Sequence, residues 1–396
     1  MLTRKEPKNL YSMALVILAA LLSIFITYTY ARSITLLYGG IEIGIALFCY
    51  YLIFKNLKTP DSTLIIIFGI LTTFSFFNGV LYGNLKSVLL LSISLVLPLA
   101  ISVLPIDFTK NGKEFGWAFF IGLVIILAQT ATGFLGKINS NTFGFYCYMS
   151  VSIGFVWYKM AKYKIPPLCL ILFGCFLSAG AGSRNVAIIL LISILLLILP
   201  SRCYKRKAFF RVVYLLAILY TIFAADIMEW IFENKELSNW LVSYTEGFSD
   251  KKWGMDERIV FLRQVRARID KLPLYNKLFG EGILKHHGHN MFYQSIYIYG
   301  YIGTILLYAM YIRIFEMANT LISECDDKIA LGCTVALVGV FFLNGGDLFL
   351  IGTEACAIIP QVLMGIIMLR YRIYKKEKQG KLSQSKEDSG ETRKAS

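Results

Sequence analysis

The sequence has few charged residues for its length. Charged residues make up 16% of its 396 residues, and hydrophobic residues make up 57%, where a soluble domain has about 25% charged residues. A chain this apolar has too few charged residues to form the surface of a protein that folds in water. The composition therefore argues against a soluble multidomain enzyme, a disordered protein and a nucleic-acid-binding protein. It indicates a membrane protein that crosses the bilayer several times.

Histidine and closely spaced cysteine are also scarce. The chain has three histidines, and none of its eight cysteines belongs to a CxxC pair. Six of the cysteines lie in apolar runs, where Cys commonly serves as a small hydrophobic residue. We therefore expect no zinc site and no disulfide framework. The first apolar run lacks a small-residue cleavage site, so we interpret it as a retained span and not as a signal peptide.

Long apolar runs fill most of the chain. A membrane-spanning helix needs about 20 mostly apolar residues, and scanning for such runs gives about twelve candidates. The predicted spans are approximately 10–31, 34–54, 62–82, 87–106, 116–135, 143–160, 167–182, 186–200, 210–228, 291–312, 329–350 and 352–369. The sequence thus predicts an all-α polytopic membrane protein. The short seventh and eighth segments are also compatible with one broken hairpin that turns at 180–185.

The basic residues predict the orientation of these spans. With twelve spans and both termini in the cytoplasm, 26 of the 40 Lys and Arg residues fall in cytoplasmic segments. The short outer loops hold only Arg32, Lys86, Lys137 and Arg184. Because short cytoplasmic loops carry an excess of Lys and Arg, this asymmetry favours both termini inside.

One polar segment interrupts the spans. Residues 229–290, between the ninth and tenth spans, contain ten basic and nine acidic residues as well as several aromatic ones. We expect an ordered extracytoplasmic subdomain there. The resulting organisation is helices 1–9 in 1–228, the loop in 229–290, helices 10–12 in 291–369 and a disordered basic cytoplasmic tail in 370–396.

The first candidate site residue is Arg184, in the sequence Gly182-Ser183-Arg184-Asn185 between two apolar segments. An Arg in this position either snorkels to the membrane surface or faces a cavity or a partner. The small residues before it leave backbone amides approachable, and a guanidinium binds phosphate oxygens in a bidentate manner. A snorkelling Arg and a phosphate ligand both remain open.

The second candidate is Arg258, in a predicted helix within the polar loop. At helical spacing Leu262, Val265, Ile269 and Leu272 form one apolar stripe, and Arg258 falls on it. The other arginines of this helix, Arg263, Arg266 and Arg268, project elsewhere and are expected to meet lipid headgroups. A guanidinium on the buried face makes Arg258 the better site candidate.

The third candidate is His289, in His286-His287-Gly288-His289-Asn290 just before the tenth span. No paired carboxylates or cysteines accompany these histidines, so a metal cluster is weakly supported. A single general base is simpler. Near the outer end of the eleventh span, Asp347 is placed either to orient His289 or to pair with Arg184, and a structural ion pair is an equal alternative.

Two local signatures resemble the O-antigen polymerase and O-antigen ligase superfamily of bacterial surface polysaccharide assembly. One is the small-residue segment that ends in Ser183-Arg184, although Asn185 replaces the more usual Gly. The other runs from Arg258 through Gly280-Glu281-Gly282 and His289-Asn290 to Gly300-Tyr301-Ile302-Gly303. The expected topology, with a large outer loop between the ninth and tenth spans, is similar as well.

This resemblance implies a metal-independent, inverting glycosyltransferase without a cofactor in the bacterial cytoplasmic membrane. Its expected partners are a polyprenyl-pyrophosphate-linked oligosaccharide, membrane lipid, and the flippase and chain-length regulator of the same pathway. The resemblance assigns Arg184 and Arg258 to the pyrophosphate leaving group and His289 to the acceptor hydroxyl. Asn290 and Asp347 complete the expected substrate-binding set.

Three functions remain open. The favoured one is a polymerase that joins lipid-linked repeat units, and its sibling is a ligase that transfers a glycan to lipid A-core or another acceptor. The third is a lipid-glycan flippase or secondary transporter. Transporters often show inverted repeats and sites near the membrane midplane, whereas the candidate residues of this chain gather in its outer segments.

Overall fold

A computed structural model gives the architecture of the chain. It describes residues 44, 47–55, 61–81, 95–104, 116–117, 120–121, 124, 140–180, 184–237, 239, 255–282, 290–345 and 355–391. The longer elements of this part are all helices, and it contains no strand. They are α3 Ser62–Leu81, α6 Ser140–Met160, α7 Ile165–Gly180, α8 Arg184–Ile198, α9 Ser201–Tyr204, α10 Lys207–Glu233, α12 Met255–Lys271, α13 Leu274–Phe279, α14 Met291–Cys325, α15 Lys328–Leu343 and α16 Ala355–Glu391.

Three of these helices, α3, α10 and α14, are long and apolar enough to cross a membrane. They also expose large apolar side chains, among them Phe76, Phe77 and Leu216. Extended apolar surfaces are rare on soluble proteins but suit a lipid environment. The chain is therefore an all-α membrane protein.

Eight predicted spans coincide with described helices. They correspond to α3, α6, α7, α8, α10, α14, α15 and α16. The tenth predicted span, 291–312, is correct only in part, because the backbone of α14 leaves the helical region at Gly300. The second predicted span is helical where it is described, at 44 and 47–54. The span 10–31, half of 87–106 and most of 116–135 lie outside the described residues. The total of twelve spans stays a prediction.

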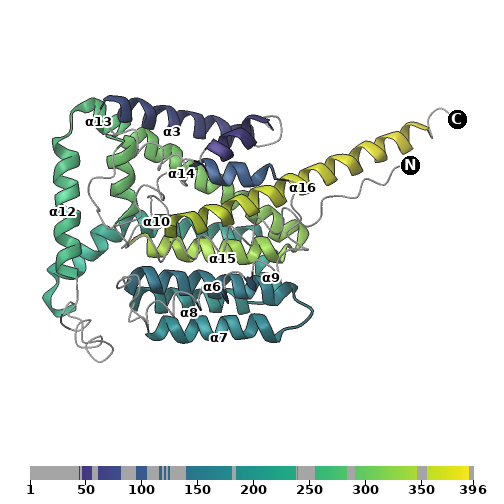
Figure 1. Cartoon of the computed structure of the whole chain (residues 1–396), viewed down its shortest axis with the longest axis horizontal. Coiled ribbons are helices and arrows are strands. Elements are labelled where there is room, and N and C mark those ends of the chain that lie inside the picture. The colour runs from purple at the N-terminus through teal and green to yellow at the C-terminus, as the bar shows by residue number, and fades with distance from the viewer. Residues whose placement is uncertain are drawn as a thin grey trace.

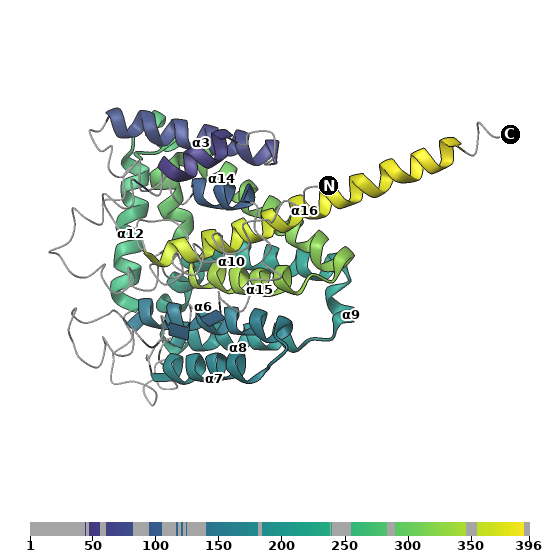
Figure 2. The ribbon, with the colours of Figure 1, turned by 45° about the vertical axis from the view of Figure 1, so that its right-hand side comes forward.

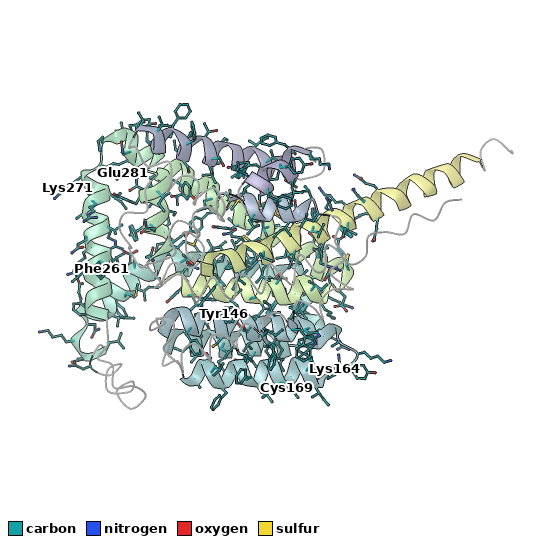
Figure 3. The ribbon with its side chains drawn as sticks, in the orientation of Figure 1. Tyr146, Lys164, Cys169, Phe261, Lys271 and Glu281 are labelled. Atoms are coloured by element: carbon teal, nitrogen blue, oxygen red, sulfur yellow. The ribbon has the colours of Figure 1, made fainter. Side chains whose placement is uncertain are left out.

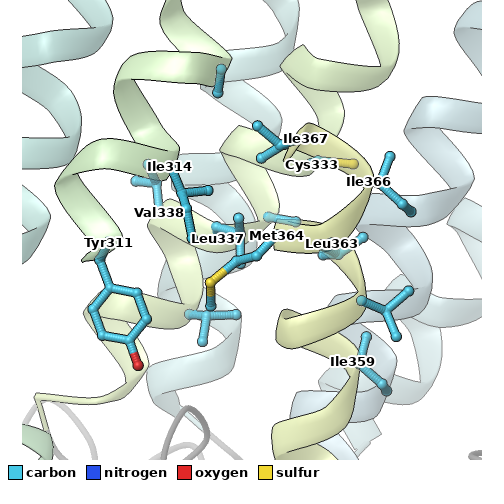
Figure 4. Close-up of a cluster of buried hydrophobic side chains, with 14 of the residues drawn as sticks. Tyr311, Ile314, Cys333, Leu337, Val338, Ile359, Leu363, Met364, Ile366 and Ile367 are labelled. Carbon is cyan, nitrogen blue, oxygen red and sulfur yellow. The ribbon is translucent and has the colours of Figure 1, made fainter. Parts of the chain in front are cut away.

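The helices form layers around α15 (Figure 1). α6, α7 and α8 make one layer, α10, α15 and α16 lie next to it, and α3 packs on α14 beyond them. All residues of α15 except Lys328 and Phe342 are buried. A helix that is apolar on every side belongs in the interior, and side chains of α14 and α16 close around it (Figure 4).

Small residues bring α15 close to α6. A β-carbon on Gly332 would collide with Val156, and one on Gly339 would collide with Tyr148. The Tyr148 hydroxyl donates a hydrogen bond to the carbonyl of Ala336 at 3.0 Å. In a membrane the lipid tails are as apolar as the helix surfaces, so burial of apolar surface does not drive helices together. Close packing of small residues and buried hydrogen bonds hold them instead.

The two ends of the bundle differ. α12 crosses one end, which we call the α12 end, and α9 lies at the opposite end, which we call the α9 end (Figures 1 and 2). Ion pairs tie the helices together at the α9 end, including Arg211 with Glu316 at 2.7 Å and Lys207 with Glu324 at 2.7 Å. Segments predicted to be cytoplasmic, at 161–164, 199–206 and 326–327, all belong to this end.

The C-terminal segment differs from its prediction. The sequence predicts a disordered tail from 370 to 396, but α16 continues as a helix to Glu391 and projects from the α9 end (Figures 1 and 2). Contacts one helical turn apart support it, because Lys375 lies over the ring of Tyr371 and Lys378 donates to the hydroxyl of Tyr374 at 2.9 Å. Such pairs stabilise a helix that leaves its packed environment.

Candidate functional site

The α12 end collects the polar segments that the sequence singled out. α12 lies across this end, and Figure 3 places Phe261 and Lys271 along it with Glu281 beside its C-terminal end. The predicted apolar stripe is confirmed, because Leu262, Val265 and Ile269 are buried. It packs on α10 and on the start of α14. This packing fixes which face of α12 is turned toward the bundle.

Two arginines of α12 pair with carboxylates near the end of α10. Arg263 donates to Glu229 at 2.7 Å and to Glu233 at 3.2 Å. Arg266 pairs with both Glu229 and Asp226. For Arg263 and Arg266 the expected contact with lipid headgroups is corrected, because both guanidinium groups pair with carboxylates of the protein; for Arg268 it stays a prediction. The hydrogen bond that Arg263 donates to Glu229 raises the pKa of Arg263 above its ordinary value.

An aromatic ring completes this group of contacts. The guanidinium of Arg266 lies 4.5 Å from the centre of the Tyr293 ring, at the start of α14. A cation over an aromatic face is attracted to it. We call Arg263, Arg266 and the three α10 carboxylates the arginine clamp. A signal for it was present in the sequence, since Asp226, Glu229 and Glu233 recur every three or four residues and share one face of α10.

α14 is broken at Gly300. The backbone there has φ 69° and ψ −179°, which lies outside the helical region. The rings of Phe292 and Tyr308, on opposite sides of the break, are 6.1 Å apart, whereas 16 residues of straight helix span about 24 Å. α14 therefore bends sharply into a first arm, 291–299, and a second arm, 301–325.

The Gly280-Glu281-Gly282 segment docks against this break. The backbone amide of Glu281 donates to the carbonyl of Tyr297, and that of Gly282 donates to the carbonyl of Ile298, both at 2.9 Å. In a straight helix these carbonyls serve amides four residues further on, beyond the break. The docked segment thus supplies polar partners where the helix is interrupted.

Glycine is required on both sides of this contact. Gly280 has φ 78°, and a β-carbon there would collide with the carbonyl of Ile298. A β-carbon on Gly300 would collide with the backbone of Leu278. The side chains add one further bond, because the Tyr297 hydroxyl donates to the Glu281 carboxylate at 2.7 Å. Two glycine motifs that are separate in the sequence therefore form one interlocked junction.

α3 secures the same junction. The amide of Asn78, a buried residue, donates to the carbonyl of Phe279 at 2.8 Å. The ring of Phe279 also stacks edge-on against Phe74 with centroids 5.0 Å apart. α13, which ends at Phe279, is consequently fixed to the bundle by α3 and by the break in α14.

Asn290 joins three helices at this end. It caps α14, since its side-chain oxygen accepts a bond from the amide of Tyr293 at 3.1 Å. Its side-chain nitrogen donates to the carbonyls of Thr221 at 3.2 Å and Gly345 at 3.1 Å. Asn290 is fully buried. The structure therefore shows a structural role for Asn290 at the start of α14, and its predicted contact with substrate stays a prediction.

The remaining candidates are described only in part. Arg184 is the first residue of α8 and Arg258 lies in the first turn of α12, both at the α12 end, but their side chains lie outside the described residues. His289 and Asp347 lie outside them entirely. The structure thus brings the backbones of Arg184, Arg258 and Asn290 to one end of the bundle.

The tyrosines on the two sides of the break in α14 differ in exposure. Tyr297 and Tyr299 are buried in the protein, whereas Tyr301 is exposed. The bend at Gly300 turns the first arm of α14 into the bundle. Among the described residues, no group of three His, Cys, Asp or Glu side chains is placed to hold a metal ion.

No family model and no curated protein matches the chain.

Proposed function

We propose that the protein is a polysaccharide polymerase of the O-antigen or capsule type. In this proposal it transfers a glycan from a polyprenyl-pyrophosphate carrier onto another lipid-linked repeat unit. The supporting observation is that Arg184, Arg258 and Asn290, which lie far apart in the sequence, all reach the α12 end of the bundle. At this end of the bundle, the glycan of a lipid-linked substrate would extend from the membrane surface and reach the site.

The proposal includes an orientation in the membrane. Twelve spans with both termini in the cytoplasm place the α9 end inside and the α12 end outside the bacterial cytoplasmic membrane. The basic residues favour this arrangement, because the α8–α10 connection carries Arg202, Lys205 and Arg206 at the α9 end. Residues 229–290 are then extracytoplasmic, and α12 lies along the outer surface.

The proposed reaction is a single displacement at the anomeric carbon of the donor. The acceptor hydroxyl oxygen forms the new bond, the bond from the anomeric carbon to the pyrophosphate oxygen breaks, and the lipid pyrophosphate leaves with the electron pair. His289 takes the proton of the hydroxyl, or positions that group. Arg184 and Arg258 stabilise the negative charge of the leaving group, for which guanidinium groups are well suited.

The arginine clamp bears on which arginines can bind the pyrophosphate leaving group. Arg263 and Arg266 already pair with three carboxylates. A pyrophosphate would have to displace those partners in order to bind there. The docked Gly282 and the capping residue Asn290 hold the chain on both sides of 283–289. These pairings disfavour Arg263 and Arg266 as ligands, and the proposal assigns the leaving group to Arg258 and Arg184.

Reconstitution of the purified protein with a lipid-linked repeat unit tests this proposal. We expect longer lipid-linked glycans by gel and mass spectrometry, with product lost in Arg258→Ala and His289→Ala. Lys271→Ala on the same helix and His286→Ala in the same loop are the matched controls. Resistance to a chelator is expected as well. Normal elongation by both site variants would refute the assignment, transfer only to lipid A-core would indicate a ligase, and translocation without elongation would indicate a transporter.

A further inference from the structure

Basic side chains at the α9 end fall into two groups that differ in how they are neutralised. Around α10, α14 and α16 they pair with carboxylates of the protein. Lys207 and Lys378 both pair with Glu324, and Arg370 pairs with Asp327. The positive charge in this part of the α9 end is therefore largely cancelled within the protein.

The second group lies around the ends of α6, α7 and α8, and its charge is not cancelled. We call it the basic rim, and it consists of Lys159, Lys162, Lys164, Arg202, Lys205 and Arg206. All six side chains are exposed, and within the described part of the chain none of them pairs with a carboxylate. The sequence explains this difference, because it has no acidic residue between Glu114 and Asp226.

The packing of the helices brings the two halves of the basic rim to one end of a single layer. α6, α7 and α8 pack on one another, and both the turn from α6 to α7 and the segment after α8 lie at the α9 end (Figures 1 and 2). Tyr204 fixes α9 there, because its hydroxyl donates to the carbonyl of Leu196 and its ring stacks on Phe210 with centroids 5.6 Å apart. The cations of α9 are consequently held on an anchored turn.

An exposed apolar surface begins directly beside the basic rim. Leu168, one helical turn after Lys164, is exposed on α7, as is Leu172. Ile198, four residues before Arg202, is 70% exposed at the end of α8. Exposed apolar side chains on the helices of a membrane protein face the lipid tails. The cations therefore stand at the edge of a lipid-facing surface.

Tyrosines mark the same level. Lys164 lies over the ring of Tyr158 at 5.0 Å and donates to its carbonyl at 2.6 Å. Tyr163, between two lysines of the basic rim, is 74% exposed. Because tyrosine is enriched where a membrane meets water, these residues indicate that the basic rim lies at the depth of the lipid headgroups.

We propose that the basic rim and the adjoining exposed faces of α7 and α8 bind an anionic phospholipid. Its phosphate accepts hydrogen bonds from the lysines and arginines, and its acyl chains lie along α7 and α8. One molecule with an acidic head and apolar tails complements both surfaces, whereas an acidic protein segment would complement the basic rim alone. This site is separate from the proposed reaction and does not depend on it.

Native mass spectrometry of the full-length protein in detergent tests this site. We expect phosphatidylglycerol to bind about tenfold more tightly than phosphatidylcholine with the same acyl chains. Lys162→Gln/Lys205→Gln removes one cation from each half of the basic rim and is expected to weaken phosphatidylglycerol binding about tenfold, with phosphatidylcholine binding unchanged. Both side chains are exposed and unpaired with carboxylates in the described part of the chain, so folding is expected to be preserved.

Lys235→Gln/Lys271→Gln is the matched control, because it removes the same charge from exposed positions at the α12 end. It is expected to bind phosphatidylglycerol like the wild type. Equal binding of the two lipids by the wild type would overturn the proposal and leave an acidic protein segment as the fitting partner. Unchanged phosphatidylglycerol binding in Lys162→Gln/Lys205→Gln would overturn the placement of the site. Displacement of the lipid by glycerol phosphate, which has no acyl chains, would overturn the contribution of α7 and α8 and indicate a site for free phosphate.

Discussion

The side-chain amide of Asn290 donates a hydrogen bond to the backbone carbonyl of Thr221, which lies 69 residues earlier in the chain, at 3.2 Å. The hydroxyl of Thr221 in turn donates to the carbonyl of Phe341 at 2.8 Å. These bonds connect α14, α10 and α15 just where the candidate loop enters the membrane bundle. A buried polar link of this kind fixes the relative positions of its elements, because an unpaired partner is costly in an apolar interior.

Replacing Asn290 is expected to destabilise the protein. Asn290→Ala removes the cap of α14 and leaves the buried carbonyls of Thr221 and Gly345 without this donor. We expect a loss of about 2–3 kcal/mol in the free energy of unfolding, measured by thermal or denaturant unfolding in detergent. Asn234→Ala, at the exposed end of α10, is the control. Equal stability of the two variants would contradict the structural role of Asn290.

Gly300→Ala is expected to disrupt the junction between the two glycine motifs. The φ of 69° with ψ of −179° belongs to a region that is essentially restricted to glycine, and the added carbon collides with the Leu278 backbone. A loss of about 3 kcal/mol or more is expected, seen as a lower unfolding midpoint. Gly69→Ala, in the middle of α3 with open space around it, is expected to be neutral or slightly stabilising.

The sequence predicts those features of the fold that depend on local hydrophobicity. The runs that form α3, α6 and α10 are long and apolar enough for their positions to be predicted to within a few residues. The stripe of Val265 and Ile269 is also visible in the sequence, because one buried face of a helix repeats at a fixed spacing.

The features that the sequence does not predict are contacts between distant segments. Arg266 is exposed on a helical wheel, and only the position of α10 shows that Glu229 neutralises it. The bend at Gly300 is similarly invisible, since a glycine inside an apolar helix is usually tolerated. Its cause is the segment at Gly282, which supplies hydrogen bonds to the interrupted helix.

Tyr148→Phe tests the polar contact between α6 and α15. The Tyr148 hydroxyl is fully buried, lies 3.0 Å from the hydroxyl of Ser193 and donates to the carbonyl of Ala336. Removing it is expected to cost about 1–2 kcal/mol, because the Ser193 hydroxyl loses a partner in an apolar interior. Unfolding in detergent measures the change. Tyr163→Phe, at an exposed position, is expected to have no effect.

Substitutions of Asp327, the residue before α15, can separate the stability gained from helix capping from that gained from the ion pair with Arg370. One carboxylate oxygen of Asp327 accepts bonds from the amides of Ile329 at 2.9 Å and Ala330 at 3.0 Å. The other oxygen pairs with Arg370 of α16, and the Asp327 side chain is only 4% exposed. The same carboxylate therefore begins the most buried helix and neutralises a cation of its neighbour.

Asp327→Ala removes both functions, and we expect a loss of about 3 kcal/mol in the free energy of unfolding. Asp327→Asn keeps an oxygen for the cap but removes the charge opposite Arg370, so its loss is expected to be smaller but still measurable. Asp326→Asn is the matched control, because Asp326 is exposed and Asn tolerates its left-handed backbone of φ 52°. Unfolding midpoints in detergent measure all three. Wild-type stability in Asp327→Asn would show that capping alone accounts for the effect, since the charge opposite Arg370 would then contribute nothing.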